Sequence, residues 1–410
     1  MTEFSRPARR ITLTLFIAQS LFSAGFIAAA TINSILGAEL SGARWAGVPA
    51  AVLMAGAALA ASFWSVLMDR IGRRNGLALG LLLGVCGLGS TILAANQRSL
   101  LIMLVGMGLL GFARAAVMLA RFAAAEVHPP KKRGEAVANV VLGGTVGAVL
   151  GPLLVGPMGV FSLRIGMNEL AGGYLAGMTL LVLAALAVLT GLRPDPRDLA
   201  RKVAELYPTS TPDGEARPPG VIFRQPVVLI AVTAMVVGQV VMVALMVITS
   251  LHMREYNHDL GGISTVISAH TLGMYAFSVI SGRLLDRWGR QPVILAGAAA
   301  LVAACVTAPL SPGLLPLMVS LFLLGLGWNF CFVGGSTLLS DQLSPEERAS
   351  IQGTNDLLVW LASAAGSLGS GLVYAATSYT VIALIGGLLS LIPLGLALTD
   401  MLKRPAPAGV

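Results

Sequence analysis

The stretch SVLMDRIGRR, residues 65–74, decides the fold of this chain, because it recurs as GRLLDRWGR at residues 282–290. The aspartates of the two copies lie 217 residues apart. A second pattern also recurs, since an acid, a proline and an arginine of the first half each have a counterpart 215 residues later. Two composite patterns at almost one offset indicate an internal duplication. The second pattern pairs Glu126 with Asp341, Pro130 with Pro345 and Arg133 with Arg348.

Long apolar runs surround both copies of this loop. Of the 410 residues, 56% are hydrophobic and only 11% are charged. Soluble domains usually carry about 25% charged residues, so this composition argues against a soluble enzyme, and we expect no enzymatic activity. Runs of about 20 apolar residues are long enough to cross a bilayer as helices. Twelve are predicted, at 12–36, 45–67, 76–95, 100–126, 137–160, 170–192, 227–251, 263–283, 292–310, 315–340, 351–376 and 380–402.

The basic residues alternate between the two sides of these spans. With the amino terminus inside, 21 Lys and Arg residues lie in inner segments and four lie in outer loops. Because inner loops carry the excess of basic residues, we expect a multi-pass protein with both termini in the cytoplasm. The net charge of +8 is spread over seven inner segments, so we expect the lipid bilayer and not nucleic acid as its partner.

A polar, proline-rich stretch divides the chain. We expect an N-terminal six-helix bundle at 1–192, a cytoplasmic linker at 193–226, a C-terminal six-helix bundle at 227–402 and a cytoplasmic tail at 403–410. The predicted fold class is all-α integral membrane, with twelve transmembrane helices in two pseudo-symmetric bundles.

The repeated loops predict two charge clusters at the inner mouth. Exposed ion pairs are individually weak, so such clusters are better suited to biasing a two-state equilibrium than to adding stability. The alternative role is anchoring by positive charge alone. The predicted gating residues are Asp69, Arg73 and Glu126 in the first half, and Asp286, Arg290 and Asp341 in the second.

Spans seven and eight each carry a helix-spaced pair of soft ligands, Met242-x-x-x-Met246 and His270-x-x-x-Met274. Positions i and i+4 lie on one face of a helix. At 1.5 Å of rise per residue, the two pairs overlap in depth in the outer half of the membrane. Thioethers select Cu(I), and imidazole also binds copper. These four residues therefore predict a copper site.

Packing is the alternative explanation for the methionines, because Met commonly fills gaps in helix interfaces. A further pair at this spacing, Met103 and Met107, lies in span four. A His-x-x-x-Met pair is scarcer, since the chain has 16 Met but only 4 His. An ionisable residue within a span is also a functional candidate by default, which favours a role for His270.

Other candidates also lie within the spans. Arg114 in span four and Asp356 in span eleven are candidates for coupling or for contact with substrate, because intramembrane charges are costly. In span five, Gly147 and Gly151 allow close helix approach, and Pro152 permits a bend.

These motifs carry a family resemblance. The repeated D-R-x-G-R loop, at Asp69–Arg73 and Asp286–Arg290, resembles the signature of the major facilitator superfamily. The first copy departs from the pattern, because Ser65 stands where that family prefers glycine. The span-five motif is similar to one found in proton-coupled exporters of the superfamily. The resemblance implies the major facilitator fold, in which two bundles rock about a site near the midplane.

Within that superfamily, the Met242, Met246, His270 and Met274 pattern resembles the CcoA-like copper importers. This resemblance implies copper import across the bacterial inner membrane to supply assembly of cbb3-type cytochrome oxidase. Copper is then the transported substrate, with no permanently bound cofactor, and donors or acceptors of copper on either side are its implied partners. Related members of the branch are linked to riboflavin uptake. An organic-solute transporter, for riboflavin uptake or proton-coupled drug efflux, therefore stays open as the alternative.

Overall fold

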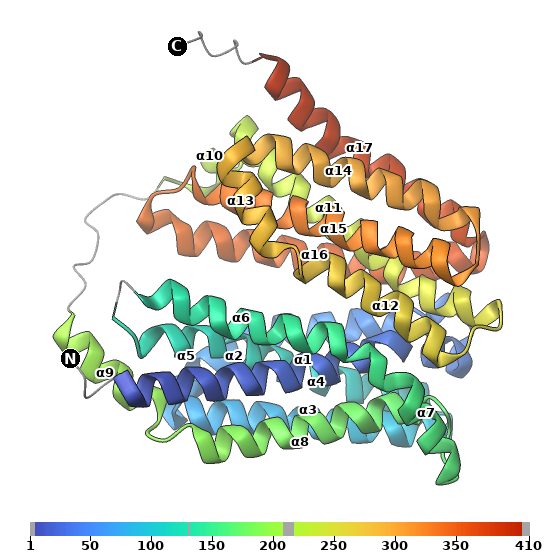
Figure 1. Ribbon diagram of the computed structural model, residues 1–410, viewed down its shortest axis with the longest axis horizontal. Helices are drawn as coiled ribbons and strands as arrows, with labels where there is room; N and C mark the ends of the chain where they lie inside the picture. Colours follow the sequence, from blue (N-terminus) through green and yellow to red (C-terminus); the bar gives the residue numbers. More distant parts are fainter. Residues whose placement is uncertain (1–4, 130–131, 208–216, 404–410) are drawn as a thin grey trace. The chain divides into compact units, whose positions relative to one another are not determined.

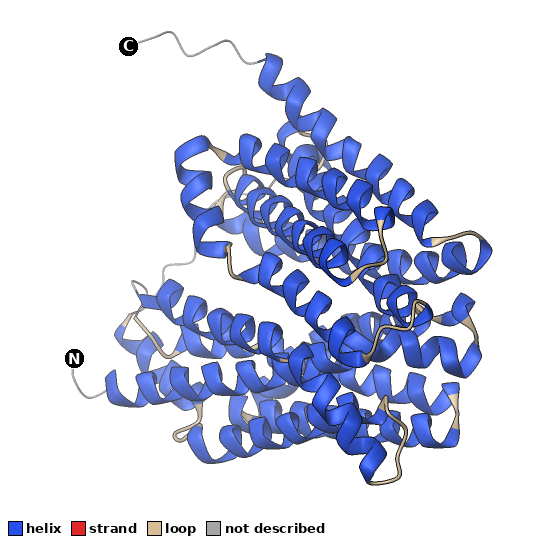
Figure 2. Cartoon of the chain, turned by 45° about the vertical axis from the view of Figure 1, so that its right-hand side comes forward, coloured by secondary structure: helices blue, strands red, loops and turns tan. Residues whose placement is uncertain are grey.

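The computed structural model describes residues 5–129, 132–207 and 217–403, and these residues form helices and no strands (Figure 2). The centre of the predicted linker and nearly all of the predicted tail lie outside the described residues. The helices of the first half are α1 (Ser5–Ser41), η1 (Ala43–Trp45), α2 (Val48–Ile71), α3 (Arg73–Gln97), α4 (Leu100–Met118), α5 (Ala120–Glu126), α6 (Arg133–Leu150), η3 (Pro152–Leu154), α7 (Val155–Arg164), α8 (Ala171–Gly191) and α9 (Pro196–Leu206).

The later helices repeat this arrangement of long, apolar segments along the chain (Figure 1). They are α10 (Pro219–Ile222), α11 (Pro226–Glu255), α12 (Leu260–Tyr275), α13 (Ser278–Trp288), α14 (Arg290–Thr307), η4 (Ala308–Leu310), α15 (Leu314–Ser340), α16 (Pro345–Ala376) and α17 (Tyr379–Lys403).

The number of membrane-crossing segments agrees with the sequence. Eleven helical segments of the described residues are long and apolar enough to cross a membrane. The helices α12 and α13 form a pair that is bent by 40°. If this pair is counted as one span, the described residues contain up to twelve spans. Two other spans each contain two helices, since α4 runs on into α5, and α6 continues through η3 into α7. The predicted all-α, multi-span fold is therefore confirmed.

The described contacts group the chain into two compact units, Met1–Thr211 with Asn257–Ser268, and Pro212–Tyr256 with Ala269–Val410. In unit 1, α1 packs on α6 and α8, α3 packs on α4 and α8, and α2 packs on α4. In unit 2, α11 packs on α16 and α17, α14 packs on α15 and α17, and α13 packs on α15. The same five neighbour relations hold in both units, as an internal duplication requires. The bundle boundaries expected at 192 and 227 stay a prediction.

Both copies of the repeated loop turn on a glycine. Gly72 separates α2 from α3 with φ 88°, and Gly289 separates α13 from α14 with φ 89°. Residues with a Cβ rarely adopt this backbone region. The glycine of the D-R-x-G-R loop is thus needed for the reversal of the chain, which places the loop's second arginine, Arg73 or Arg290, at the first position of the next helix.

The span-five motif lies against α1. A Cβ built on Gly147 would stand 1.9 Å from the carbonyl oxygen of Ser20, and one on Gly151 would stand 2.3 Å from that of Ala24. The helix changes from α6 to the 3-10 segment η3 at Pro152. These glycines therefore permit backbone contact between α1 and α6.

Candidate functional site

His270 on α12 is fully buried. Its Nδ1 lies 2.9 Å from the backbone carbonyl oxygen of Leu321 on α15. Because a carbonyl oxygen only accepts, Nδ1 carries the proton and donates, which leaves the lone pair on Nε2. That Nε2 has no hydrogen-bond partner among the described residues. Metal-ligating histidines usually have this arrangement, with one ring nitrogen fixed by a carbonyl and the other available.

Two glycines bring α12 and α15 into backbone contact beside this histidine. A Cβ on Gly325 would stand 2.2 Å from the carbonyl oxygen of His270, and one on Gly273 would stand 2.4 Å from that of Phe322. The faces of α12 that carry His270 and Met274 therefore pack on α15 between about residues 321 and 326. Met274 is 7% exposed and so is also buried.

Met242 and Met246 lie on the side of α11 that packs on α15. Met235 contacts the position of Gly335, and Gly238 contacts Cys331. Met242 follows Gly238 by four residues and Met235 by seven, so it lies on the same face of α11. Its side chain is 5% exposed. Met246 follows Gln239 by seven residues, and the Gln239 Oε1 accepts a hydrogen bond of 2.7 Å from Trp328 of α15.

These contacts also set the level of the two methionines. Along α11, residues 235, 238 and 239 lie opposite residues 335, 331 and 328 of α15, so the two helices run antiparallel. Continuing this register places Met242 and Met246 opposite roughly residues 321–328. His270 and Met274 pack at that same level. All four predicted ligands thus share one level of α15, and their convergence on a single ion is part of the proposal below.

A buried amide supports the bend that follows Met274. The Asn329 Nδ2 donates to the Met274 carbonyl oxygen at 2.6 Å and to the Ser278 Oγ at 3.1 Å, while its Oδ1 accepts from Ser281. A break inside a membrane helix leaves backbone groups that must find partners. Asn329 supplies a partner for one of them, the Met274 carbonyl oxygen, and sequence reasoning missed this residue.

Arg114 and Asp356 lie in different units. The Arg114 guanidinium stands over the ring of Phe26, 4.5 Å from its centroid. Asp356 is exposed on α16, next to the buried Asn355. Both residues have further interactions. Their roles in coupling or substrate contact stay predictions.

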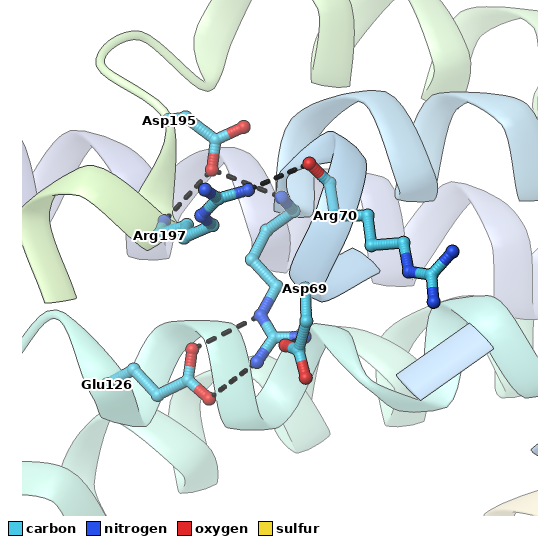
Figure 3. Close-up of polar contacts among 6 residues, drawn as sticks. Asp69, Arg70, Glu126, Asp195 and Arg197 are labelled. Carbon is cyan, nitrogen blue, oxygen red and sulfur yellow. Dashed lines mark hydrogen bonds and ion pairs between the residues drawn. The ribbon is translucent and has the colours of Figure 1, made fainter. Parts of the chain in front are cut away.

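The first predicted charge cluster is assembled within unit 1 (Figure 3). Arg73 on α3 binds Glu126 of α5 through two hydrogen bonds of 3.0 and 3.3 Å, and its third nitrogen lies 3.3 Å from Asp69. The Arg73 side chain is 17% exposed, whereas that of Asp69 is 66% exposed. Bidentate pairing of a shielded arginine fixes the geometry, so Glu126 is the stronger of the two partners.

The second cluster is only partly formed. Arg290 binds Asp341 at 2.8 Å. Asp286 is exposed, and within residues 217–403 no hydrogen bond or ion pair joins it to either of them. Both clusters lie inside single units. Because a rigid-body rotation of a unit does not separate pairs within it, gating by these six residues stays a prediction.

Asp195 is a further residue that sequence reasoning missed. It ends the turn after α8, and its carboxylate accepts from the backbone N–H groups of Arg73 and Arg74 at 3.1 Å each and from that of Arg197 at 2.9 Å. It therefore caps the first turns of both α3 and α9. Figure 3 shows the Asp195 carboxylate beside Arg197. Its signal in the sequence is an Asp-Pro pair at a helix start.

A tight ion pair also joins the end of the linker to α16. Arg217 binds Glu347 through bonds of 2.7 and 2.8 Å, and the Glu347 side chain is 2% exposed. Glu347 additionally accepts from the Ser344 N–H in a capping box. The hydrogen bonds from Arg217, and then that from Ser344, lower the pKa of Glu347 to about 2. Sequence reasoning did not find this pair.

The duplicated bundle of apolar helices, with paired charged loops on α2–α3 and α13–α14, defines a multi-span membrane transporter. The Major Facilitator Superfamily model matches residues 11–257 and again 230–409, and the chain belongs to that superfamily.

Several relatives match nearly the whole chain. An uncharacterized MFS-type transporter of Bacillus subtilis, YdeG, is 35% identical over 94% of this chain and 90% of its own. The riboflavin transporter RfnT of Brucella anthropi is 29% identical over 90% of each chain. Among solved structures, the nucleoside transporter NupG superposes with a TM-score of 0.74 at 17% identity, covering 96% of this chain and all of NupG. That likeness shows the fold.

Proposed function

We propose that this transporter imports copper, as Cu(I), across the bacterial inner membrane, with both termini in the cytoplasm. The observation that carries the proposal is His270, whose Nδ1–H is fixed by the Leu321 carbonyl while its buried Nε2 has no partner within the described residues. A buried polar atom without a partner is costly. A bound cation supplies the missing partner.

The three methionines complete the proposed ligand set. Met242 and Met274 are buried, and both lie with Met246 at the level of His270 along α15. Four neutral ligands hold a monovalent ion without burying fixed charge, which lipid penalises. A hard divalent ion prefers clusters of oxygen ligands. Among the described residues, no group of three or more His, Cys, Asp or Glu is placed to hold one.

The two units then move the ion by alternating exposure of this site. The ion binds from the outer side and is released inward, where acceptors for assembly of cbb3-type cytochrome oxidase are the proposed recipients. Copper is the cargo of this cycle, and no resident cofactor is part of the proposal.

Cellular accumulation of labelled copper tests this function. We expect His270→Ala and Met242→Leu to lower the uptake rate by about tenfold or more, because even outer-shell changes at metal sites cost 10–100-fold. Met107→Leu is the matched control, since Met107 belongs to the other helix-spaced pair and is also buried. Equal uptake by all four proteins would overturn the copper proposal.

Riboflavin uptake is the second candidate. The riboflavin transporter RfnT aligns along 90% of each chain. A polar and aromatic cluster in unit 2 also suits a flat heterocycle, because Trp328 stacks on Phe332 with ring centroids 4.9 Å apart and donates to Gln239. Gln239 donates in turn to Ser363 at 2.7 Å. Stacking and amide hydrogen bonds recognise aromatic rings.

The two candidates are separated by substituting this cluster. If riboflavin is the substrate, Trp328→Leu lowers uptake of labelled riboflavin and His270→Ala does not. If copper is the substrate, only the copper assay responds to His270→Ala, and riboflavin uptake equals that of cells without the transporter.

A further inference from the structure

A cationic pocket of about 500 Å³ lies in unit 1, beside the first charge cluster. Four of its lining residues are arginines, and only one is an acid. The arginines come from three helices, Arg73 from α3, Arg133 from α6, and Arg197 and Arg201 from α9. Its remaining lining residues are Phe122, Ala125, Glu126 and Ala200.

The guanidinium groups of this pocket are not equally occupied. Arg73 is held by Glu126 and Asp69, so it forms a fixed wall. Arg197 donates from one terminal nitrogen to the Arg70 carbonyl oxygen at 3.0 Å, but its Nε is buried without a hydrogen-bond partner. Because a guanidinium carries five N–H donors, most of the donors of Arg197 make no hydrogen bond to the described residues.

The other two arginines are also available. Arg133 makes one long hydrogen bond, of 3.4 Å, from its Nε to the His128 carbonyl oxygen. The side chain of Arg201 is exposed, and no hydrogen bond or ion pair joins it to the described residues. Three arginines with available donors, against the single and already paired Glu126, give the pocket a net positive charge.

The position of the pocket indicates what fills it. It adjoins the end of the span Leu100–Glu126 and the start of the span Arg133–Arg164, so it lies at a membrane surface. Phe122 is 48% exposed and adds apolar surface at the rim. α9 buries Leu199 and Val203 against its neighbours and so keeps its arginines at this level.

We propose that this pocket binds a phosphate group, carried by an anionic lipid headgroup or by a free phosphate compound. The planar guanidinium fork matches phosphate oxygens in pairs, and basic residues near a membrane surface attract anionic headgroups. A phosphate bound there contacts Arg133 of α6 and Arg201 of α9, two helices that both pack on α5.

Binding is measured with the purified full-length chain in nanodiscs. One set contains phosphatidylcholine alone and is titrated with inorganic phosphate and pyrophosphate. The other contains a rising fraction of phosphatidylglycerol. Ligands that bind only the folded state raise the midpoint of thermal unfolding. We expect a saturable rise in at least one arm, and the arm that responds identifies the source of the phosphate.

Variants locate the binding on the pocket. We expect Arg201→Gln and Arg133→Gln each to weaken the apparent affinity about fivefold, the effect of one basic residue near a membrane surface. Lys202→Gln is the matched control, because it removes the same charge from the next, exposed position of α9 but does not line the pocket. We expect it to bind as the wild type does.

Two results would overturn the proposal. One is the absence of a midpoint shift in both arms for the wild type. The other is an equal loss of affinity in Lys202→Gln and Arg201→Gln, which would assign the effect to diffuse surface charge. Because the copper ligands lie on α11 and α12, neither result bears on the proposed substrate.

Discussion

His270 is held in one tautomer by a backbone carbonyl, and this single bond determines what the residue is able to do. With the proton on Nδ1, the buried Nε2 presents a lone pair, which is the form that binds a metal ion. The sequence predicts that His270 lies within a membrane span, and an ionisable residue there is a functional candidate. It could not reveal the tautomer, because the Leu321 carbonyl lies 51 residues away on α15.

Asp195 shows the opposite situation, a residue with a large structural role that the sequence did not single out. Its carboxylate caps two helices at once only because the turn after α8 returns to the start of α3. A helix-start pattern predicts the cap on α9. The cap on α3 depends on a contact across 121 residues or more, which local sequence cannot show.

We expect Asp195→Ala to lower the free energy of unfolding by about 1–2 kcal/mol, because caps of single helices contribute in that range. The midpoint of thermal unfolding in detergent measures the effect. Asp198→Ala is the control, since it removes an exposed carboxylate from the same helix. Equal midpoints for the two variants would show that the double cap adds no stability.

The pKa of Glu347 gives a pH prediction at the same scale. The hydrogen bonds from Arg217, and then that from Ser344, lower this pKa from 4.5 to about 2 in the folded state. The contact therefore contributes its full stability above pH 4.5 and loses it as the pH falls from 4.5 towards 2.

Glu347→Gln is the variant that isolates this term. We expect the difference in unfolding midpoint between wild type and Glu347→Gln to be constant from pH 7 to about pH 5 and to shrink below that. A difference that grows on acidification has the wrong sign and would contradict the assigned pKa shift.

At the scale of elements, small residues decide how closely helices approach. The glycines of span five predict close packing against another helix, but the sequence does not identify that helix. The structure shows that α1 is the partner, with the Ser20 carbonyl oxygen filling the space above Gly147. A repeat of glycines predicts close approach, and only the tertiary arrangement says to which helix.

We expect Gly147→Ala to destabilise the chain by about 1–3 kcal/mol, because its Cβ would overlap the α1 backbone and force the helices apart. Thermal unfolding in detergent measures this cost. Gly134→Ala on the same helix is the control, since nothing lies within 4 Å of the Cβ it adds. If both variants unfold at the wild-type temperature, the backbones of α1 and α6 do not touch at Gly147.

Span eight is predicted from the sequence as one continuous run, but the structure divides it into α12 and α13. The sequence did not predict the bend between them. Hydropathy is continuous across the junction of α12 and α13, so the apolar pattern gives no sign of the 40° change in direction. The buried Asn329, which donates to the Met274 carbonyl oxygen beside the bend, lies on another helix. A polar residue within a span indicates a functional or structural site, but the sequence does not show which groups on other helices it contacts.

At the scale of the whole molecule, the duplication visible in residues 65–74 and 282–290 is reproduced by the contacts within each unit. Five equivalent neighbour relations recur, and each charged loop turns on a glycine with positive φ. The second loop lacks the full cluster, because Asp286 does not join Arg290 and Asp341 within the described chain. The two halves thus share their fold and differ in their charge contacts.

Transport of Cu(I) by the purified protein tests the central claim most directly. The chain is reconstituted into proteoliposomes that contain a Cu(I) chelator, and the rate at which external Cu(I) enters is measured for wild type, His270→Ala and Met107→Leu. We predict saturable entry through the wild type and Met107→Leu, and at least about a tenfold loss with His270→Ala. Entry that is the same with His270→Ala as with the wild type, or no faster than through empty liposomes, would contradict the account.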